Sequence, residues 1–110
     1  MGDGPCAIVE QVMSLPVVLR PEAVKDTAEA IGYFDGLRPG LGRTFLIQVQ
    51  EVLLRVSSMP ESHGIVWMNV RAARLRRFTY VVYFRVHIDR VEVLAVVQGN
   101  RDAAAWQSRE

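Results

Sequence analysis

The spacing of the apolar residues changes halfway along the chain, and this change limits the fold more than any other feature. Between about residues 21 and 57, apolar side chains recur every three or four positions, which is typical of amphipathic helices. Over residues 77–88 they occupy every second position, and residues 91–97 are almost all apolar, as in strands. A helical half followed by a mainly antiparallel sheet indicates the α+β class.

The helical half is predicted to be an antiparallel hairpin. The first helix is expected over residues 21–35, with Pro21 at its first position and Glu22 near its positive end. Residues 35–40 contain two glycines and a proline, which break the helix, and a second helix follows to about residue 57. The apolar stripes are predicted to comprise Val24, Thr27, Ala28, Ile31 and Phe34 in the first helix, and Phe45, Leu46, Val49, Val52, Leu53 and Val56 in the second.

The sheet is predicted to have about four strands. An N-terminal strand is expected over residues 15–20, and others over residues 65–70, 77–88 and 91–97. The last of these reads as a central strand covered on both faces. A turn is expected at Asp89 and Arg90, and a short C-terminal helix over residues 103–109, capped by Asp102.

Residues 14–110 are expected to form a single domain, because a chain of this size buries one core. The first 13 residues show no clear periodicity, and we expect a flexible or non-native extension there, with Met13 as an alternative start. The single cysteine and two histidines do not predict a metal site, and we expect no cofactor. No apolar run has the roughly 20 residues of a membrane span, so we expect a cytoplasmic protein without a membrane partner.

Several kinds of catalytic site are not expected. The glycines of residues 36–43 connect two helices and do not follow a strand, so they do not predict a phosphate-binding loop. The candidate nucleophiles Ser57, Ser58 and Ser62 have one histidine nearby, His63, and do not form a recognised nucleophile motif. His87 is expected to be a solvated residue on the outer face of a strand.

Arginines dominate the second half of the chain. Residues 1–61 carry 8 acidic and 5 basic residues, whereas residues 62–110 carry 4 acidic and 8 basic ones. Six arginines fall within 20 residues with Asp89 as the one acid among them, and Tyr83 and Trp106 supply aromatic surface. Such a surface can bind phosphate groups or an acidic protein partner, and the arginines can equally be solvated. The six are Arg71, Arg74, Arg76, Arg77, Arg85 and Arg90.

Four segments together resemble the RelE/ParE family of toxins from bacterial type II toxin–antitoxin systems. They are LRPEAVKDTAEAIGYF, MPESHG, VRAARLRRFTYVVYFRV and VEVLAVVQGNRDAAAW, and they occur in the family's order. The resemblance covers about residues 17–109. It implies the family's α+β fold, with a helical hairpin packed on the sheet.

The two branches of the family differ in activity. RelE-like members cut mRNA on the ribosome, with charged groups on the central strands and an arginine and a tyrosine near the C-terminus. Here Val81 and Trp106 stand where the resemblance places an arginine and that tyrosine, and only Arg101 keeps a matching charge. Tryptophan cannot act as an acid or base at neutral pH. If the chain is a metal-independent ribonuclease, Arg101 is its candidate catalytic residue.

ParE-like members resemble the chain better. They inhibit DNA gyrase by binding, which needs no catalytic residue in the toxin, although Thr79 and Gln98 replace residues usual in the family. The resemblance also implies a cognate antitoxin, which would dock on the helical hairpin and the open sheet edge and would alone bind operator DNA. The ribosome with its mRNA is the alternative target, and an inactive antitoxin-binding homologue is a third interpretation. The predicted target-binding residues are Arg71, Arg74, Arg77, Tyr83, Arg85, Arg101, Trp106 and Arg109.

Overall fold

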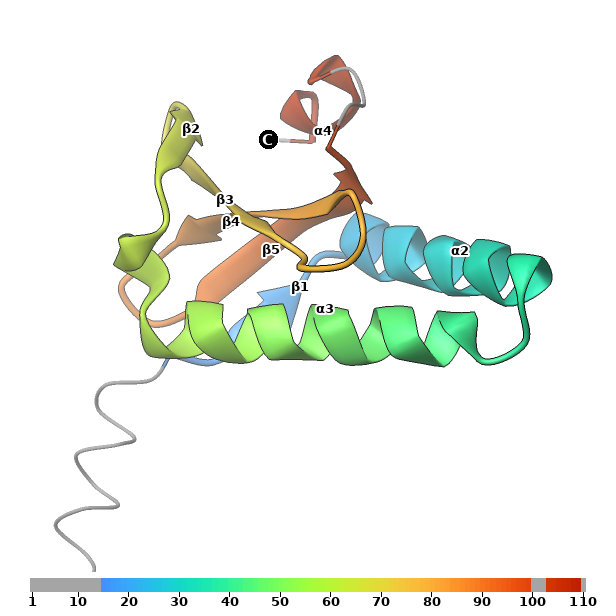
Figure 1. The fold of residues 1–110 in the computed structure, drawn as a ribbon. Coiled ribbons are helices and arrows are strands. Elements are labelled where there is room, and N and C mark those ends of the chain that lie inside the picture. Colours follow the sequence, from blue (N-terminus) through green and yellow to red (C-terminus); the bar gives the residue numbers. More distant parts are fainter. Residues whose placement is uncertain (1–14, 100–102, 110) are drawn as a thin grey trace, which may run out of the picture.

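In the computed structural model, which describes residues 15–99 and 103–109, a helical hairpin packs against one face of a five-stranded sheet (Figure 1). The chain begins with β1 (Val17–Leu19) and continues into the two long helices, α2 (Pro21–Leu37) and α3 (Leu41–Ser58). The remaining elements are η1 (Pro60–Ser62), β2 (Ile65–Trp67), β3 (Val70–Arg74), β4 (Tyr80–Val86), β5 (Val91–Gln98) and α4 (Ala104–Gln107). The predicted α+β class is confirmed.

The sheet has the strand order β1-β5-β4-β3-β2. β1 is parallel to β5 and all other neighbours are antiparallel, so the prediction of a mainly antiparallel sheet is confirmed. β1 is short and pairs only with residues 91–93 of β5. A bulge follows, because Tyr83 lies opposite Ala95 whereas Phe84 lies opposite Val93, which leaves Leu94 as an extra residue.

The sheet has one strand more than the approximate number predicted, because the prediction of a single strand over residues 65–70 is wrong. That segment is divided between β2 and β3 by a tight turn at Met68 and Asn69, where Met68 has a positive φ of 53°. Residues 71–74, expected to be a connection, belong to β3, because they pair with β4 from Arg71 opposite Phe84 to Arg74 opposite Val81. Neither Met68 nor Asn69 is a glycine, so the sequence carries no strong turn signal there.

The hairpin was predicted correctly, and the buried side of its first helix only in part, because Thr27 is buried and Ile31 and Phe34 pack against the core. The buried residues of α2 are Ala23, Thr27 and Ala30. Val24 and Ala28 were predicted to be buried, but Val24 is 53% exposed and Ala28 is exposed as well. Small side chains on this side let the helix lie close to the sheet. The prediction for α3 is confirmed, because its buried residues include Phe45, Val49, Val52 and Val56.

The turn between the helices depends on two glycines. Gly40 precedes α3 with a φ of 89°, a conformation that other residues rarely adopt. Gly42 lies so close to α2 that a Cβ atom would stand 2.6 Å from the carbonyl oxygen of Ile31. Its N–H donates to Oδ1 of Asp35 at 2.8 Å, which satisfies one of the free amide groups at the start of α3.

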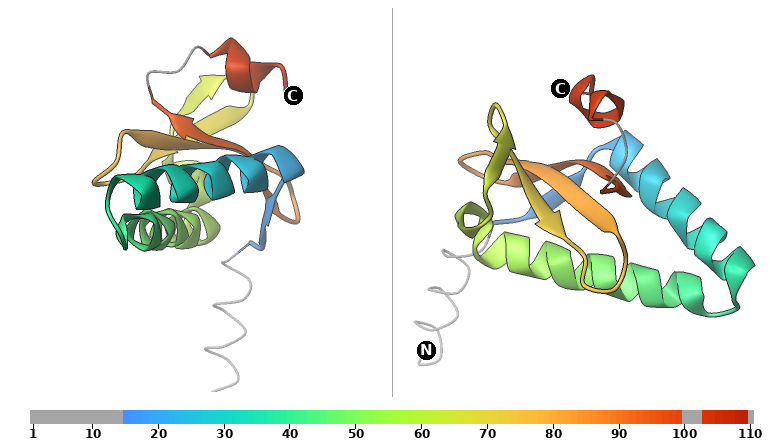
Figure 2. Two further views of the ribbon diagram at one scale, coloured as in Figure 1. Left: turned by 90° about the vertical axis from the view of Figure 1, so that its right-hand side faces the viewer. Right: turned by 45° about the horizontal axis from the view of Figure 1, so that its top comes forward.

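Hydrophobic residues pack on both faces of the sheet. Between the sheet and the hairpin, Phe45 lies against the rings of Phe34, Phe78 and Tyr80. On the opposite face α4 closes a smaller cluster, and the left view of Figure 2 shows α4 and the hairpin on opposite sides of the sheet. Of the helices in the described ranges, none combines the length and the apolar character that crossing a bilayer requires.

Candidate functional site

The face of the sheet that points away from the hairpin, called the open face below, is covered mainly by Trp106 of α4. Its ring stacks on Tyr83 of β4 with centroids 4.0 Å apart and an angle of 15° between the planes. Trp67 of β2 meets it edge-on at 5.8 Å. Only 4% of Trp106 is exposed, and it packs in one cluster with Val70 and Leu94. The described part of the open face is therefore aromatic and aliphatic at its centre.

A bidentate ion pair holds the residues after α4 against β5. Arg109 Nη1 lies 2.6 Å from Asp26 Oδ2, and its Nη2 lies 3.2 Å from Oδ1. The same pair satisfies the β5 backbone beyond the end of β1, because Val96 N–H donates to Asp26 and Arg109 donates to the Leu94 carbonyl oxygen. Hydrogen bonding to the Asp26 carboxylate raises the pKa of Arg109, against an opposing effect of burial. Arg20 donates to the Arg109 carbonyl oxygen as well.

A second charged cluster lies around Glu92 at the start of β5. Its Oε1 is 2.8 Å from His87 Nε2, and Arg20 and Arg85 lie 3.6 Å and 4.0 Å from its carboxylate. The hydrogen bond from His87 is the main cause that lowers the pKa of Glu92, with smaller contributions from the two arginines, and burial opposes them. His87, expected to be solvated, is thus hydrogen-bonded and about three-quarters buried.

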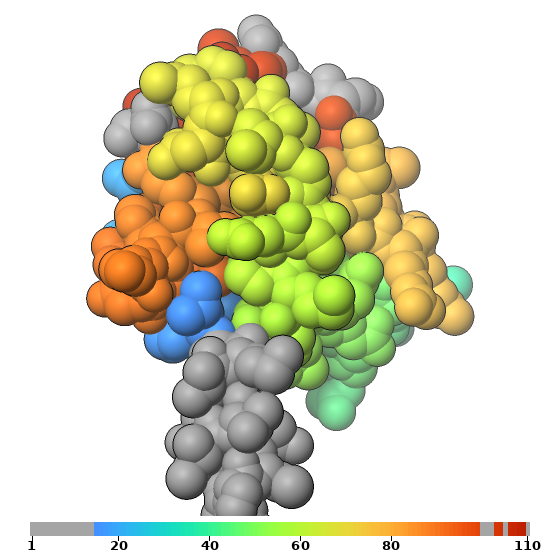
Figure 3. All heavy atoms as spheres, turned by 90° about the vertical axis from the view of Figure 1, so that its left-hand side faces the viewer, coloured from blue at the N-terminus to red at the C-terminus, as the bar shows by residue number. Residues whose placement is uncertain are grey.

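The structure divides the predicted basic surface. Arg71 donates to the His63 carbonyl oxygen at 2.6 Å, while Arg85 and Arg109 pair with the carboxylates described above. Arg74 and Arg77 remain exposed at the β3–β4 loop. Figure 3 shows this loop, in gold, and the β4–β5 turn, in orange, on opposite sides of one face of the molecule. Of the predicted residues the fold brings together Tyr83 and Trp106, and Arg101 lies outside the described residues, as does Asp102.

Asp26 and Glu92, which the sequence analysis did not single out, complete these clusters. Asp26 and Arg109 are 83 positions apart, so no local pattern links them. Glu92 and His87 are five positions apart on either side of a turn, and only a correct hairpin register would have paired them. Within residues 15–99 and 103–109, no three His, Cys, Asp or Glu side chains are grouped to hold a metal ion.

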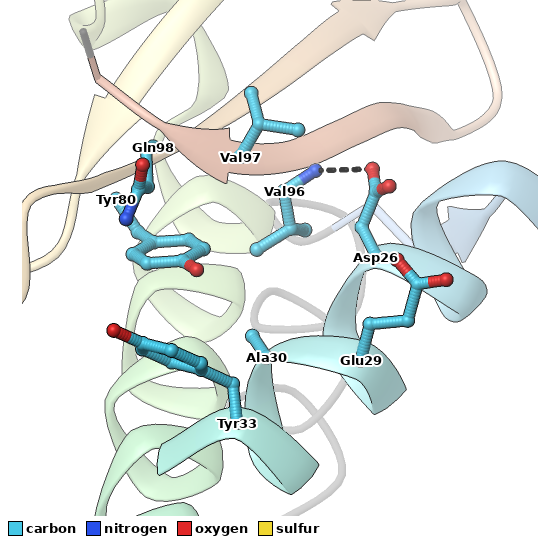
Figure 4. Close-up of a pocket in the computed structure, with 8 residues that line it drawn as sticks. All are labelled: Asp26, Glu29, Ala30, Tyr33, Tyr80, Val96, Val97 and Gln98. Atoms are coloured by element: carbon cyan, nitrogen blue, oxygen red, sulfur yellow. Dashed lines mark hydrogen bonds between the residues drawn. The ribbon is translucent and has the colours of Figure 1, made fainter. Parts of the chain in front are cut away.

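A groove of about 310 Å³ runs between α2 and the edge of β5 that β1 leaves uncovered (Figure 4). Tyr33 and Tyr80 face each other at one end, near Gln98. Asp26 and Glu29 lie at the other end, and Ala30 and Val96 form the floor between them. The groove can hold an extended segment. Because Asp26 is already paired with Arg109, Glu29 is the carboxylate of the lining that can attract a basic side chain.

Comparisons with known proteins support the fold. No protein-family model matches the sequence, and neither does any curated protein. One chain of the solved structure described as the chromosomal ParDE TA system from P. aeruginosa is similar, with a TM-score of 0.70 and 14% sequence identity. The similarity covers 78% of this chain and 97% of that one. The RelE/ParE-like fold expected from the sequence is therefore confirmed.

Proposed function

We propose that the protein is the toxin of a type II toxin–antitoxin pair, that it acts by binding, and that DNA gyrase is its target. The fold shared with a chain of a ParDE system supports the first part. One observation carries the second part, namely the stacking of Trp106 on Tyr83 over the centre of the open face. A buried aromatic stack at the centre of this face provides little acid–base chemistry.

The physical reason lies in what RNA cleavage requires. Cleavage without a metal needs a base near the attacking 2′-hydroxyl and charge next to the phosphate. The indole of Trp106 can only donate a hydrogen bond, and the Tyr83 ring lies beneath it. Inhibition by binding makes no such demand, so this arrangement favours a ParE-like action.

Purified gyrase provides the test. The chain is added to gyrase, supercoiled DNA and ATP, and cleaved DNA is measured after denaturation of the enzyme. We expect cleaved DNA to accumulate with gyrase and no cleavage without it. Two arginines among the predicted target-binding residues that the structure describes are exposed, and replacing them, as Arg74→Gln and Arg77→Gln, should reduce the effect. Arg55→Gln, on the exposed side of α3, is the matched control. Unchanged gyrase activity at a large excess of chain would refute the target.

Ribosome-dependent RNA cleavage is the alternative, and one observation favours it. His87 and Glu92 form a hydrogen-bonded acid–base pair beside Arg85 at the rim of the open face. If this pair is catalytic, translating ribosomes with the chain will yield codon-phased mRNA fragments. His87→Ala and Arg101→Ala should then each abolish the fragments, whereas Lys25→Ala should not. Intact mRNA with the unaltered chain would exclude this activity.

The groove between α2 and β5 is the docking site that we propose for the antitoxin. An extended antitoxin segment would lie along β5 beyond the Asp26–Arg109 pair, which already satisfies the Leu94 carbonyl oxygen and the Val96 N–H. Tyr33 is 57% exposed in the groove, so Tyr33→Ala should weaken antitoxin binding without disturbing the core. Leu54→Ala, on the far side of α3, should leave binding unchanged. The candidate partner is a small protein encoded directly upstream.

An inactive homologue that keeps only antitoxin binding makes a different prediction. Cells would grow normally when the chain is expressed without the antitoxin, although the purified proteins would still bind tightly. Growth arrest on expression, relieved by the antitoxin, would exclude this interpretation.

A further inference from the structure

Three exposed arginines lie within four residues at the β3–β4 loop, namely Arg74 at the end of β3 and Arg76 and Arg77 in the loop itself. Within the described ranges none of them is paired with a carboxylate. Other arginines, by contrast, lie within 4.0 Å of a carboxylate: Arg20, Arg85, Arg90 and Arg109. The fold thus uses the charge of those arginines and leaves the charge of the loop available.

Apolar residues on either side hold this loop in place. Leu75 is 5% exposed, and the Phe78 ring lies 4.8 Å from Phe34 and 5.2 Å from Phe45. The Leu75 N–H donates to the Tyr80 carbonyl oxygen at 3.1 Å and closes the base of the loop. Because the backbone is already anchored, binding a ligand there requires little further ordering of the loop.

The surroundings of the loop are poor in acidic residues. No Asp or Glu occurs from Val70 to Ile88. Through Phe78 the loop contacts both ends of the α2–α3 turn, which adds the exposed Arg38 and Arg43. The acid in that turn, Asp35, is hydrogen-bonded to the Gly42 N–H. This end of the molecule is therefore strongly positive although the net charge of the chain is only +1.

The kind of ligand follows from what the loop lacks. Large exposed apolar side chains occur elsewhere on the described surface, but none lies between Val70 and His87. An acidic protein segment that folds on binding needs a broad apolar surface to cover, and here the apolar surface is confined to a small hollow lined by Leu75, Phe78 and Tyr80. Guanidinium groups bind phosphate in a bidentate manner and need no apolar surface for it.

We propose that Arg74, Arg76 and Arg77 bind the phosphate backbone of a nucleic acid. This inference goes beyond the proposed function, because it concerns the chain without gyrase or an antitoxin. Duplex DNA and single-stranded RNA offer the same phosphate chemistry, so both are included in the test.

Fluorescence anisotropy with a short labelled DNA duplex and a labelled RNA of equal length tests the proposal. The triple variant Arg74→Gln, Arg76→Gln, Arg77→Gln should bind at least about tenfold more weakly, and its salt dependence should fall by about 2–3 in log–log slope. The control carries the same charge change on other elements, as Lys25→Gln, Arg55→Gln and Arg90→Gln. It should lose less than about threefold. Circular dichroism confirms that both variants remain folded.

Three results would overturn the proposal. The triple variant could bind like the unaltered chain, or the control could lose as much affinity as the triple variant. As a third result, a labelled polyglutamate of equal charge could bind the loop as tightly as the nucleic acids do, which would identify an acidic protein as the ligand of the loop. Binding of either nucleic acid through the three arginines supports the proposal. The nucleic acid that binds more tightly is then identified as the preferred ligand.

Discussion

The two faces of the sheet are stabilised in different ways. The helix side is covered by α2 and α3, of 17 and 18 residues, whereas α4 on the open face has four. Burial on the helix side is shared among many side chains from the hairpin and four strands. On the open face it depends on Trp106 and on the ion pair of Arg109 with Asp26. Loss of one contact should therefore weaken the whole fold in the first case and release one segment in the second.

Phe45→Ala is expected to have the largest effect. Phe45 is fully buried among Phe34, Phe78 and Tyr80, so the change removes a large side chain and leaves a cavity. We expect the free energy of unfolding to fall by about 4 kcal/mol, measured by urea denaturation. Phe45→Leu, which keeps most of the volume, should lose clearly less. Equal losses for the two variants would mean that the cavity does not determine the effect.

Trp106→Ala should have a smaller and more local effect on stability than Phe45→Ala. Trp106 is 4% exposed, but α4 is short, and its release removes one cluster while the helix side stays packed. We expect a loss of about 3 kcal/mol, with hydrogen exchange rising in α4 and the β2–β3 hairpin and staying low in α3. Trp106→Tyr keeps an aromatic ring above Tyr83 and should recover part of the loss. Rapid exchange throughout the molecule would contradict the separation of the two faces.

Asp26→Ala tests the ion pair that holds the end of the chain. The change leaves the Arg109 guanidinium and the Val96 N–H without the carboxylate, and both groups are largely buried. We expect the free energy of unfolding, measured by urea denaturation, to fall by about 2 kcal/mol. Lys25→Ala, next to it on α2, removes only a solvent-exposed pair with Glu29 and should cost less than about 0.5 kcal/mol. Similar losses in the two variants would show that the Asp26–Arg109 pair stabilises the fold no more than a solvent-exposed ion pair does.

The same contrast explains what the sequence could predict. Periodicity identified the hairpin, α3's buried side and the central position of β5, because many residues repeat one signal there. It failed for Val24, since Ala23 and Ala30 pack against the sheet although alanine gives only a weak hydrophobic signal. The turn at Met68 was missed because neither of its residues is a glycine.

The contacts of the candidate site were harder to predict, because they join residues distant in the sequence. Tyr83 and Trp106 were both selected, but their stacking depends on how the chain returns over the sheet. The arginines were selected as a group, and only the fold shows that Arg71 and Arg85 have partners while Arg74 and Arg77 are exposed.

Glu92 makes the stability of the open face depend on pH. Its pKa is lowered below 4.5, chiefly by the hydrogen bond with His87, so its charged form stabilises the fold. A group with a lowered pKa contributes fully above about pH 4.5 and loses its contribution as the pH falls through the folded pKa. We expect Glu92→Gln to cost about 1 kcal/mol at pH 7 and the difference from the unaltered chain to shrink towards pH 3. A difference that stays constant over this range would contradict a charged Glu92.

Met68→Gly should have the smallest effect, and we expect this change to stabilise the fold. Met68 is 66% exposed at the turn that joins β2 to β3, and its φ of 53° is unfavourable for a side chain with a Cβ atom. Glycine removes that strain at some cost in unfolded-state entropy, so we expect a gain of about 0.5–1 kcal/mol in urea denaturation. Asn69→Gly is the matched control, because Asn69 has no positive φ and gains nothing from the change. The gain should appear as slower hydrogen exchange in β2, whose Trp67 packs against Trp106, while the helix side remains unchanged. Equal stabilisation by both glycines would mean that the turn is flexible in general and that Met68 is not strained.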